Sequence, residues 1–134
     1  MQPDEASVLI IEDDANNLLI LTSLLRLIGV KHIHGHASGR QGLEFAERLD
    51  QVDLILLDIQ LPDEDGYIVL ERIRANPKLH AVRVVAVTAN VLPHDEARAR
   101  AAGFDGFIGK PLSFERFPQQ IRTLLNGESV WISR

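Results

Sequence analysis

Acidic, hydroxyl and basic side chains stand directly after short apolar runs of the sequence. In chain order they are Glu12 and Asp13, then Asp58, Thr88 and Lys110. In an open α/β sheet the carboxyl ends of the strands line one crevice, so these side chains are expected to converge there. Carboxylates in contact repel one another unless a hard cation lies among them, and Mg²⁺ suits because it accepts oxygen ligands. A carboxylate held in this way can attack phosphorus in line, while metal, hydroxyl and ammonium meet the charge on the phosphoryl oxygens.

A simpler interpretation of any single acid is that it caps a helix, because Asp is common just before a helix begins. Asp13 or Asp14 could cap the helix that is predicted to follow them. A full set of acids, hydroxyl and ammonium at four separate strand ends is much harder to obtain by chance. The set therefore favours a phosphoacceptor site over a collection of caps.

Short apolar runs alternate with longer amphipathic segments five times along the chain. Three runs are nearly continuous in Val, Ile and Leu, which is typical of parallel strands covered on both faces. Five such units predict an α/β fold with a doubly wound sheet and right-handed crossovers. The second strand is polar and the fifth is short, so both suit the sheet edges. Strands are predicted at about 7–12, 31–36, 53–58, 82–88 and 105–109, and helices at about 15–28, 39–49, 66–75, 94–102 and 114–126.

The last predicted helix has an ambiguous start. Pro118 fits badly in a helix that begins at Phe114, because proline lacks the amide donor and crowds the preceding turn. We therefore expect an irregular or delayed start. Ser113 is a candidate N-cap, and the apolar face would hold Phe114, Phe117, Ile121, Leu124 and Leu125.

The composition is that of one ordinary globular domain and argues against several other classes. The 134 residues carry a formal net charge of −5, which argues against a nucleic-acid-binding surface. There is no cysteine, so disulfides and thiolate metal sites are excluded. No apolar run approaches the ~20 residues of a membrane span, and the acidic start is unlike a signal peptide, so the cytoplasm is the expected location. We predict a single domain over residues 1–134, with a core at about 7–126 and a tail at 127–134 that is too short for an output domain.

Four motifs resemble those of the receiver domain of two-component response regulators, over about residues 7–126. They are VLIIEDD at 8–14, DLILLDIQLPD at 53–63 followed by Asp65-Gly66, VVAVTA at 84–89 and GFDGFIGKP at 103–111. The resemblance implies a flavodoxin-like three-layer sandwich with strands in the order 2-1-3-4-5. It also implies a single-domain regulator similar to the chemotaxis response regulators.

By this resemblance Asp58 is the phosphoacceptor, and the cofactor is Mg²⁺ or Mn²⁺. Asp13 matches the direct metal ligand, and the backbone carbonyl of Gln60 matches the third protein ligand. Glu12 stands where Asp is more common and is expected to act through water. Gln60 and Asn90 would flank the phosphoryl group and tune its lifetime by positioning or blocking water.

The same resemblance assigns the switch residues. Thr88 matches the switch hydroxyl and Lys110 matches the lysine that pairs with the phosphoryl group. The Lys110–Pro111 bond is expected to be cis. Phe107 occupies the aromatic switch position, where Tyr is usual, and without a hydroxyl its coupling must depend on packing alone.

The implied function is a signalling switch of a two-component phosphorelay, not an enzyme beyond its own phosphorylation and dephosphorylation. A sensor histidine kinase or histidine phosphotransfer protein would dock near residues 15–19 and the loop after Lys110. A downstream output protein, or a second copy in a homodimer, would use the face of the fourth helix, fifth strand and fifth helix. No nucleic acid or membrane partner is expected.

Two other functions stay open. One is a degenerate receiver that acts as a constitutive interaction module, which the departures at Glu12 and Phe107 leave open. The other is an aspartyl-phosphate phosphohydrolase of the haloacid dehalogenase type. That class places a second acid two residues after the nucleophile, where this chain has Gln60, so it is the weaker alternative.

A row of histidines on the second strand is a separate signal. His32, His34 and His36 alternate and so point to one face, where they could hold Zn²⁺ or Ni²⁺. A partly exposed face that is rich in histidine is the simpler interpretation, because spacing alone does not supply converging geometry.

The remaining signals are cationic and aromatic side chains outside the strand ends. Arg72, Arg74, Arg98 and Arg100 are interpreted as solvated helix faces. Trp131 in the tail is expected to pack or to lie loose, with an anchor for a partner as the alternative.

Overall fold

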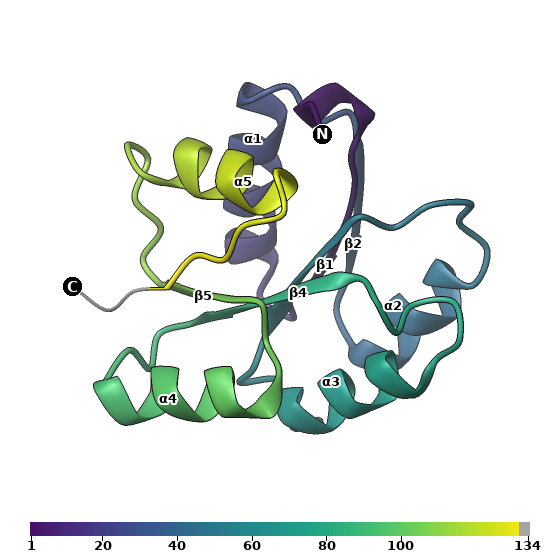
Figure 1. The fold of residues 1–134 in the computed structure, drawn as a ribbon, viewed down its shortest axis with the longest axis vertical. Helices are drawn as coiled ribbons and strands as arrows, with labels where there is room; N and C mark the ends of the chain where they lie inside the picture. Colours follow the sequence, from purple (N-terminus) through teal and green to yellow (C-terminus); the bar gives the residue numbers. More distant parts are fainter. Residues whose placement is uncertain (132–134) are drawn as a thin grey trace.

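The chain folds into one five-stranded parallel sheet with helices on both faces. A computed structural model describes residues 1–131 and is drawn in Figure 1. The strands lie in the order β2-β1-β3-β4-β5 and every neighbouring pair is parallel, which confirms the predicted fold class and strand order. Their bounds are β1 Ser7–Ile11, β2 His32–His36, β3 Leu54–Asp58, β4 Arg83–Thr88 and β5 Gly106–Gly109.

Five helices complete a three-layer sandwich. They are α1 (Ala15–Leu27), α2 (Gly39–Ala46), α3 (Gly66–Ala75), α4 (Pro93–Ala102) and α5 (Phe117–Leu125). Helices α1 and α5 cover one face of the sheet, whereas α2, α3 and α4 cover the other (Figure 1). A short 3₁₀ helix, Pro3–Glu5, precedes β1 and was not predicted. None of the helices in the described part of the chain is both long and apolar enough to cross a membrane.

Strands β1 and β3 form the centre of the sheet, and all of their residues are buried. Successive side chains of a strand point to opposite faces. Val8 and Ile10 therefore pack in the layer with α1 and α5, whereas Leu9 and Ile11 pack in the layer with α2, α3 and α4. Coverage on both faces explains why these runs are almost continuously apolar until the strands leave the core.

Helix α1 is capped by Asp14 and not by Asp13. The Asp14 side chain accepts a hydrogen bond from the backbone N–H of Asn17 at 2.9 Å, as an N-cap does. Asp13 is exposed beside it. The capping interpretation thus applies to Asp14 and leaves the Asp13 carboxylate available at the end of β1.

Helix α5 has the delayed start that Pro118 predicts. It begins at Phe117, with Pro118 in its first turn, where a missing amide donor costs little. The Ser113 hydroxyl accepts from the N–H of Arg116 in the preceding turn, so Ser113 does not cap α5. The prediction that Phe114 lies on the apolar face is wrong, because its side chain is 70% exposed. The rest of the predicted apolar face is buried: Phe117, Ile121, Leu124 and Leu125.

The segment after α5 returns to the sheet. Val130 forms a parallel bridge with Gly106, and the N–H of Phe107 donates to the Val130 carbonyl at 2.8 Å. Figure 1 shows this segment running from α5 to the outer side of β5. Trp131 is half-buried against the core layer of α2, α3 and α4, so of the two expected outcomes, packing or lying loose, the structure shows packing.

Candidate functional site

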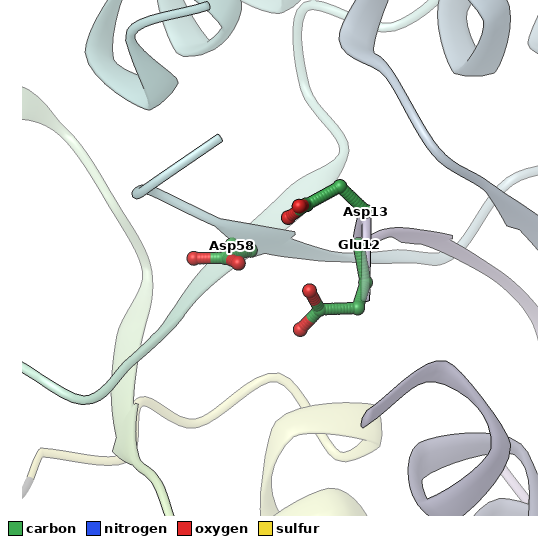
Figure 2. A group of neighbouring side chains, drawn as sticks. All are labelled: Glu12, Asp13 and Asp58. Atoms are coloured by element: carbon green, nitrogen blue, oxygen red, sulfur yellow. The ribbon is translucent and has the colours of Figure 1, made fainter. Parts of the chain in front are cut away.

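Three carboxylates converge at the carboxyl ends of β1 and β3. One carboxylate oxygen each from Glu12, Asp13 and Asp58 lies within 4.8 Å of the others. Figure 2 shows the Glu12 and Asp13 side chains leaving the end of β1 beside the Asp58 carboxylate. Glu12 and Asp58 are 2% and 6% exposed, whereas Asp13 is open to solvent. The cluster is thus buried on one side and accessible on the other.

Local hydrogen bonds fix both buried carboxylates. The backbone N–H of Asp14 donates to Glu12 Oε2 at 3.1 Å, in the turn that leads into α1. The backbone N–H of Gln60 donates to Asp58 Oδ1 at 2.9 Å. Each carboxylate is therefore oriented by an amide two residues further along the chain.

Lys110 joins the cluster from the end of β5. Its Nζ lies 2.6 Å from Glu12 Oε1 and 3.2 Å from Asp58 Oδ2, and its side chain is 16% exposed. The Lys110 backbone N–H donates to the Thr88 carbonyl at 2.8 Å, which extends the pairing of β4 and β5 to this residue. The Lys110–Pro111 bond is cis, as the resemblance implied. One ammonium thus serves two acids.

Burial and neighbouring charges shift the pKa values of Glu12 and Lys110. Burial raises the pKa of Glu12 above its ordinary value, and the neighbouring Asp58 adds to this effect against the hydrogen bonds from Lys110 and Asp14. Burial alone would lower the pKa of Lys110, but the Glu12 hydrogen bond and the charges of Asp58 and Glu12 outweigh it and raise the pKa. Lys110 therefore carries its charge at neutral pH.

The donor set fits a hard divalent cation. Three carboxylates against one ammonium leave two negative charges in excess when all four groups are ionised. Every candidate ligand atom in the cluster is oxygen, the element that Mg²⁺ and Mn²⁺ prefer. A divalent cation at this position would balance the charge that Lys110 leaves uncompensated.

Thr88 lies next to the cluster at the end of β4. Its hydroxyl is fully buried, accepts from the N–H of Asn90 at 3.0 Å and lies 3.4 Å from Gln60 Oε1, to which it donates. The exposed side chains of Gln60 and Asn90 line one open pocket with Tyr67 and Arg98. The structure thus brings together the two residues that were predicted to flank the phosphoryl group.

The loop that follows Asp58 is closed by a close backbone approach. Gln60 and Asp65 form an isolated antiparallel bridge, and the N–H of Gly66 donates to the Ile59 carbonyl at 3.4 Å. A Cβ atom at Gly66 would lie 2.4 Å from Ile59 Cα, so only glycine permits this approach. The contacts of Gly66 with Ile59 therefore fix the backbone of the residue that directly follows Asp58.

Phe107 is separated from the carboxylates by the sheet. Its side chain is fully buried in the core layer of α2, α3 and α4, where Phe104 and Trp131 also pack. Phe107 pairs with Ala86 of β4, two residues before Thr88. The candidate switch residues are therefore linked through the β4–β5 pairing.

Several side chains have contacts that the sequence did not reveal. Arg98 lies over the Tyr67 ring at 4.0 Å and Arg100 over the Trp131 ring at 4.2 Å, so neither is simply solvated. The prediction that Arg74 lies on a solvated helix face is wrong, since its guanidinium donates to the carboxylate of Asp105 and to several backbone carbonyls. None of these contacts follows from a sequence motif.

The histidine row packs on an aromatic ring. The rings of His34 and His36 lie 5.1 Å and 4.7 Å from the ring of Phe45, while His32 is exposed. Within residues 1–131, the only group of three or more side chains that meets the geometry of a metal site is Glu12, Asp13 and Asp58. The structure gives the histidine row a packing role on α2.

The strand order, with acids at the ends of β1 and β3 and a lysine after β5, indicates the class of receiver domains. The model of the response regulator receiver domain matches residues 8–122, and the chain belongs to this family. The polar-differentiation response regulator DivK of Brucella ovis is 37% identical over 119 residues, which are 89% of this chain and 95% of DivK. The DivK of Brucella anthropi is 36% identical over the same length.

Solved structures of receiver domains agree in fold. The receiver domain of sensor histidine kinase PA1611 from Pseudomonas aeruginosa PAO1 is 32% identical, with a TM-score of 0.78 over 92% of this chain and 98% of that one. It is described with a magnesium ion coordinated in its active site cleft. A signal receiver domain from Colwellia psychrerythraea 34H is 27% identical, with a TM-score of 0.80 over 90% of this chain and 98% of that one.

Proposed function

We propose that this protein is the phosphoacceptor switch of a two-component phosphorelay and that it takes a phosphoryl group on Asp58. The observation that carries the proposal is the cluster of Glu12, Asp13 and Asp58 with Lys110 Nζ 3.2 Å from the Asp58 carboxylate. A structural ion pair would need one acid, but this cluster holds three acids, of which Glu12 and Asp58 contact Lys110. Membership of the receiver family supports the same assignment.

Asp13, Asp58 and the backbone carbonyl of Gln60 would hold Mg²⁺ or Mn²⁺, with Glu12 acting through water. Once bound, the ion supplies the positive charge that lets a phosphoryl group approach three carboxylates. Asp58 Oδ1 is oriented by the Gln60 N–H and Asp58 Oδ2 by Lys110, so the nucleophile is held at both oxygens. This preorganisation favours attack in line on phosphorus.

The donor is a phosphohistidine of a sensor histidine kinase or phosphotransfer protein. A bond forms from an Asp58 carboxylate oxygen to phosphorus, and the bond from phosphorus to the imidazole nitrogen breaks. The imidazole keeps the electron pair and takes up a proton. Lys110 then pairs with a phosphoryl oxygen, and the Thr88 hydroxyl turns from Gln60 to donate to another.

The proposed donor would dock beside α1 and the loop after Lys110. An apolar pocket of about 190 Å³ lies there, and the exposed side chains of Ile20 and Phe114 contribute to its wall. Leu19, the neighbour of Ile20 on α1, is 64% exposed. Exposed apolar side chains grouped around a pocket suit a helical partner that presents its phosphohistidine toward Asp58.

The second candidate function is a constitutive interaction module. The observation that favours it is the Glu12–Lys110 contact at 2.6 Å, which is shorter than the contact of Lys110 with Asp58. A lysine held by Glu12 would be less available to a phosphoryl group. The phosphohydrolase alternative has no such support, because Gln60 stands where that class needs its second acid.

Labelling with a small phosphodonor separates these functions. Wild type, Asp58→Asn and the exposed-acid control Asp63→Asn are incubated with acetyl phosphate in Mg²⁺ or in chelator, and intact mass is measured. We expect one hydroxylamine-labile phosphoryl group per chain in wild type and Asp63→Asn with Mg²⁺, and none in Asp58→Asn. Absence of label in wild type would support the module, and rapid multiple turnover would support the hydrolase.

A further inference from the structure

The segment after α5 forms an additional edge to the sheet. The chain turns at Gly127, where φ is +89°, and runs back along the side of β5 that faces away from β4. The Phe107 N–H that points outward from β5 donates to the Val130 carbonyl at 2.8 Å. An open strand edge pairs readily with any extended chain, so this segment protects the edge of β5.

Other contacts fix the same segment. Arg83, the first residue of β4, donates from Nη2 to the Glu128 carbonyl at 2.6 Å. A Cβ atom at Gly106 would lie 3.0 Å from the Val130 carbonyl oxygen, so glycine at this position allows the close approach. Val130 packs against the core layer of α1 and α5, and Trp131 packs against the layer on the other face. The segment thus closes the end of both core layers.

Helix α4 buries fewer residues than α3 or α5 and contacts this segment through Arg100. Only Glu96 and Ala99 of α4 are buried, whereas α3 and α5 each bury four residues. The Arg100 guanidinium of α4 lies 4.2 Å from the centre of the Trp131 ring and also pairs with Glu96. A cation over an indole face is attracted by the ring quadrupole. Trp131 therefore adds an attachment to a helix that has little apolar contact of its own.

The attachment of this segment leaves one polar atom unsatisfied. Arg83 Nε is buried and has no hydrogen-bond partner among the described residues, although the Nη2 atom of the same guanidinium bonds to Glu128. A buried donor without an acceptor reduces the net gain from such a contact. Trp131 is only half-buried, so its removal from the surface uncovers a limited area.

We infer that residues 128–131 form a strap that fixes α4 on the sheet and closes the edge of β5. With the strap in place, the outward N–H of Phe107 is already bonded to Val130 and Arg100 is held against Trp131. Displacement of the strap would leave this edge of β5 unpaired and would remove the attachment of α4 to Trp131.

The first test compares two full-length variants with the same change in charge. Val130→Asp places a carboxylate where Val130 packs on the core layer, whereas Ser129→Asp adds one at an exposed neighbour. In Val130→Asp we expect the Phe107 amide and the α4 amides to exchange hydrogen at least tenfold faster. We also expect quenching of Trp131, the only tryptophan of the chain, by acrylamide to rise. Ser129→Asp should match wild type in all three measurements.

The second test uses the contact with α4 and a matched control on the same helix. Arg100→Ala removes the cation from Trp131, whereas Arg98→Ala removes one from Tyr67. Arg100→Ala should speed exchange in α4 and raise Trp131 quenching while the Phe107 amide stays protected, and Arg98→Ala should leave Trp131 quenching unchanged. Unchanged α4 exchange in both Val130→Asp and Arg100→Ala would overturn the strap, as would equal effects of Val130→Asp and Ser129→Asp. Because Arg100→Ala leaves the core intact, it gives an answer even if Val130→Asp fails to fold.

Discussion

The Lys110 ammonium lies 2.6 Å from Glu12 Oε1 and 3.2 Å from Asp58 Oδ2. Glutamate carries one methylene more than aspartate, and this extra reach lets Glu12 extend from the end of β1 to the lysine. The two acids therefore share one cation, and a divalent ion that neutralises them would release Lys110 toward a phosphoryl oxygen. The balance between Glu12, Lys110 and Asp58 is open to direct measurement.

Glu12→Gln should weaken Mg²⁺ binding by about tenfold, or ~1.4 kcal/mol, because it removes one negative charge from the cluster without changing its shape. Isothermal titration calorimetry measures the change. Glu12→Asp keeps the charge and is the matched control, with Mg²⁺ affinity expected within a few-fold of wild type. Equal affinities of Glu12→Gln and wild type would show that Glu12 does not contribute to the ion site.

Asp58→Asn should stabilise the metal-free protein by about 1 kcal/mol, because it removes one of three mutually repelling carboxylates while Lys110 keeps Glu12. Urea unfolding in chelator measures the gain. Saturating Mg²⁺ should stabilise wild type and so reduce or reverse the difference. Asp63→Asn removes an exposed acid outside the cluster and should change the stability little.

Thr88→Val should lower the free energy of unfolding by about 1 kcal/mol, because the N–H of Asn90 loses the acceptor that the buried Thr88 hydroxyl provides. Thr88→Ser keeps the hydroxyl and is the control for that bond. Labelling of Asp58 by a small phosphodonor should persist in Thr88→Val, since Thr88 does not form the new bond. A complete loss of label would mean that Thr88 is needed for the transfer itself.

Gly66→Ala should destabilise the protein by about 3 kcal/mol, because the new Cβ would lie 2.4 Å from backbone atom Cα of Ile59. Thermal or urea unfolding measures the loss. Gly42→Ala is the comparison, since its Cβ would meet side-chain atoms and no backbone atom: Ile11 Cγ1 at 3.0 Å and His36 Cβ at 3.8 Å. We also expect slower labelling of Asp58 in Gly66→Ala, because Ile59 is the next residue along the chain. Similar stability of the two variants would mean that the loop after Asp58 adapts freely.

The histidine row should make stability depend on pH in the mildly acidic range. Burial against its neighbours lowers the pKa of His34 below its usual 6.5, and the charges of His32 and His36 add to the effect. The unfolded chain then binds the proton more readily, so the stability present above pH 6.5 is lost as the pH falls through the lower pKa of the folded state. His34→Gln should flatten this part of the profile of unfolding free energy against pH. The exposed His80→Gln should leave it unchanged, and an unaltered profile in His34→Gln would contradict the assignment.

The strand ends could be predicted because β1, β3 and β4 are buried on both faces. In such strands the first polar side chain after the apolar run marks the crevice, which is where Glu12, Asp58 and Thr88 lie. No sequence signal indicated the contact between Glu12 and Lys110. It depends on the length of both side chains and on the distance from β1 to β5 across β3 and β4, and only the assembled sheet determines that distance.

The two ends of α5 show why some features of the fold could not be predicted from the sequence. Helical spacing alone placed Phe114 on the apolar face, but Pro118 lacks an amide donor and moves the helix start to Phe117. Beyond the helix, the sequence has no periodic pattern that predicts the pairing of Val130 with Gly106, although Gly127 marks the turn before it. It exists because tertiary folding leaves one edge of β5 open nearby.

The candidate site gathers residues as far apart as Glu12 and Lys110, which are 98 positions apart in the chain. An unfolded chain cannot present them together, so a cation that binds reversibly at the site has affinity for the native state alone. By mass action, any such ligand raises the free energy of unfolding of the whole molecule by about 2.7 kcal/mol at a hundred times its dissociation constant. The midpoint of thermal unfolding therefore measures how much of the site is occupied, and this measurement needs neither a radioactive donor nor a known partner.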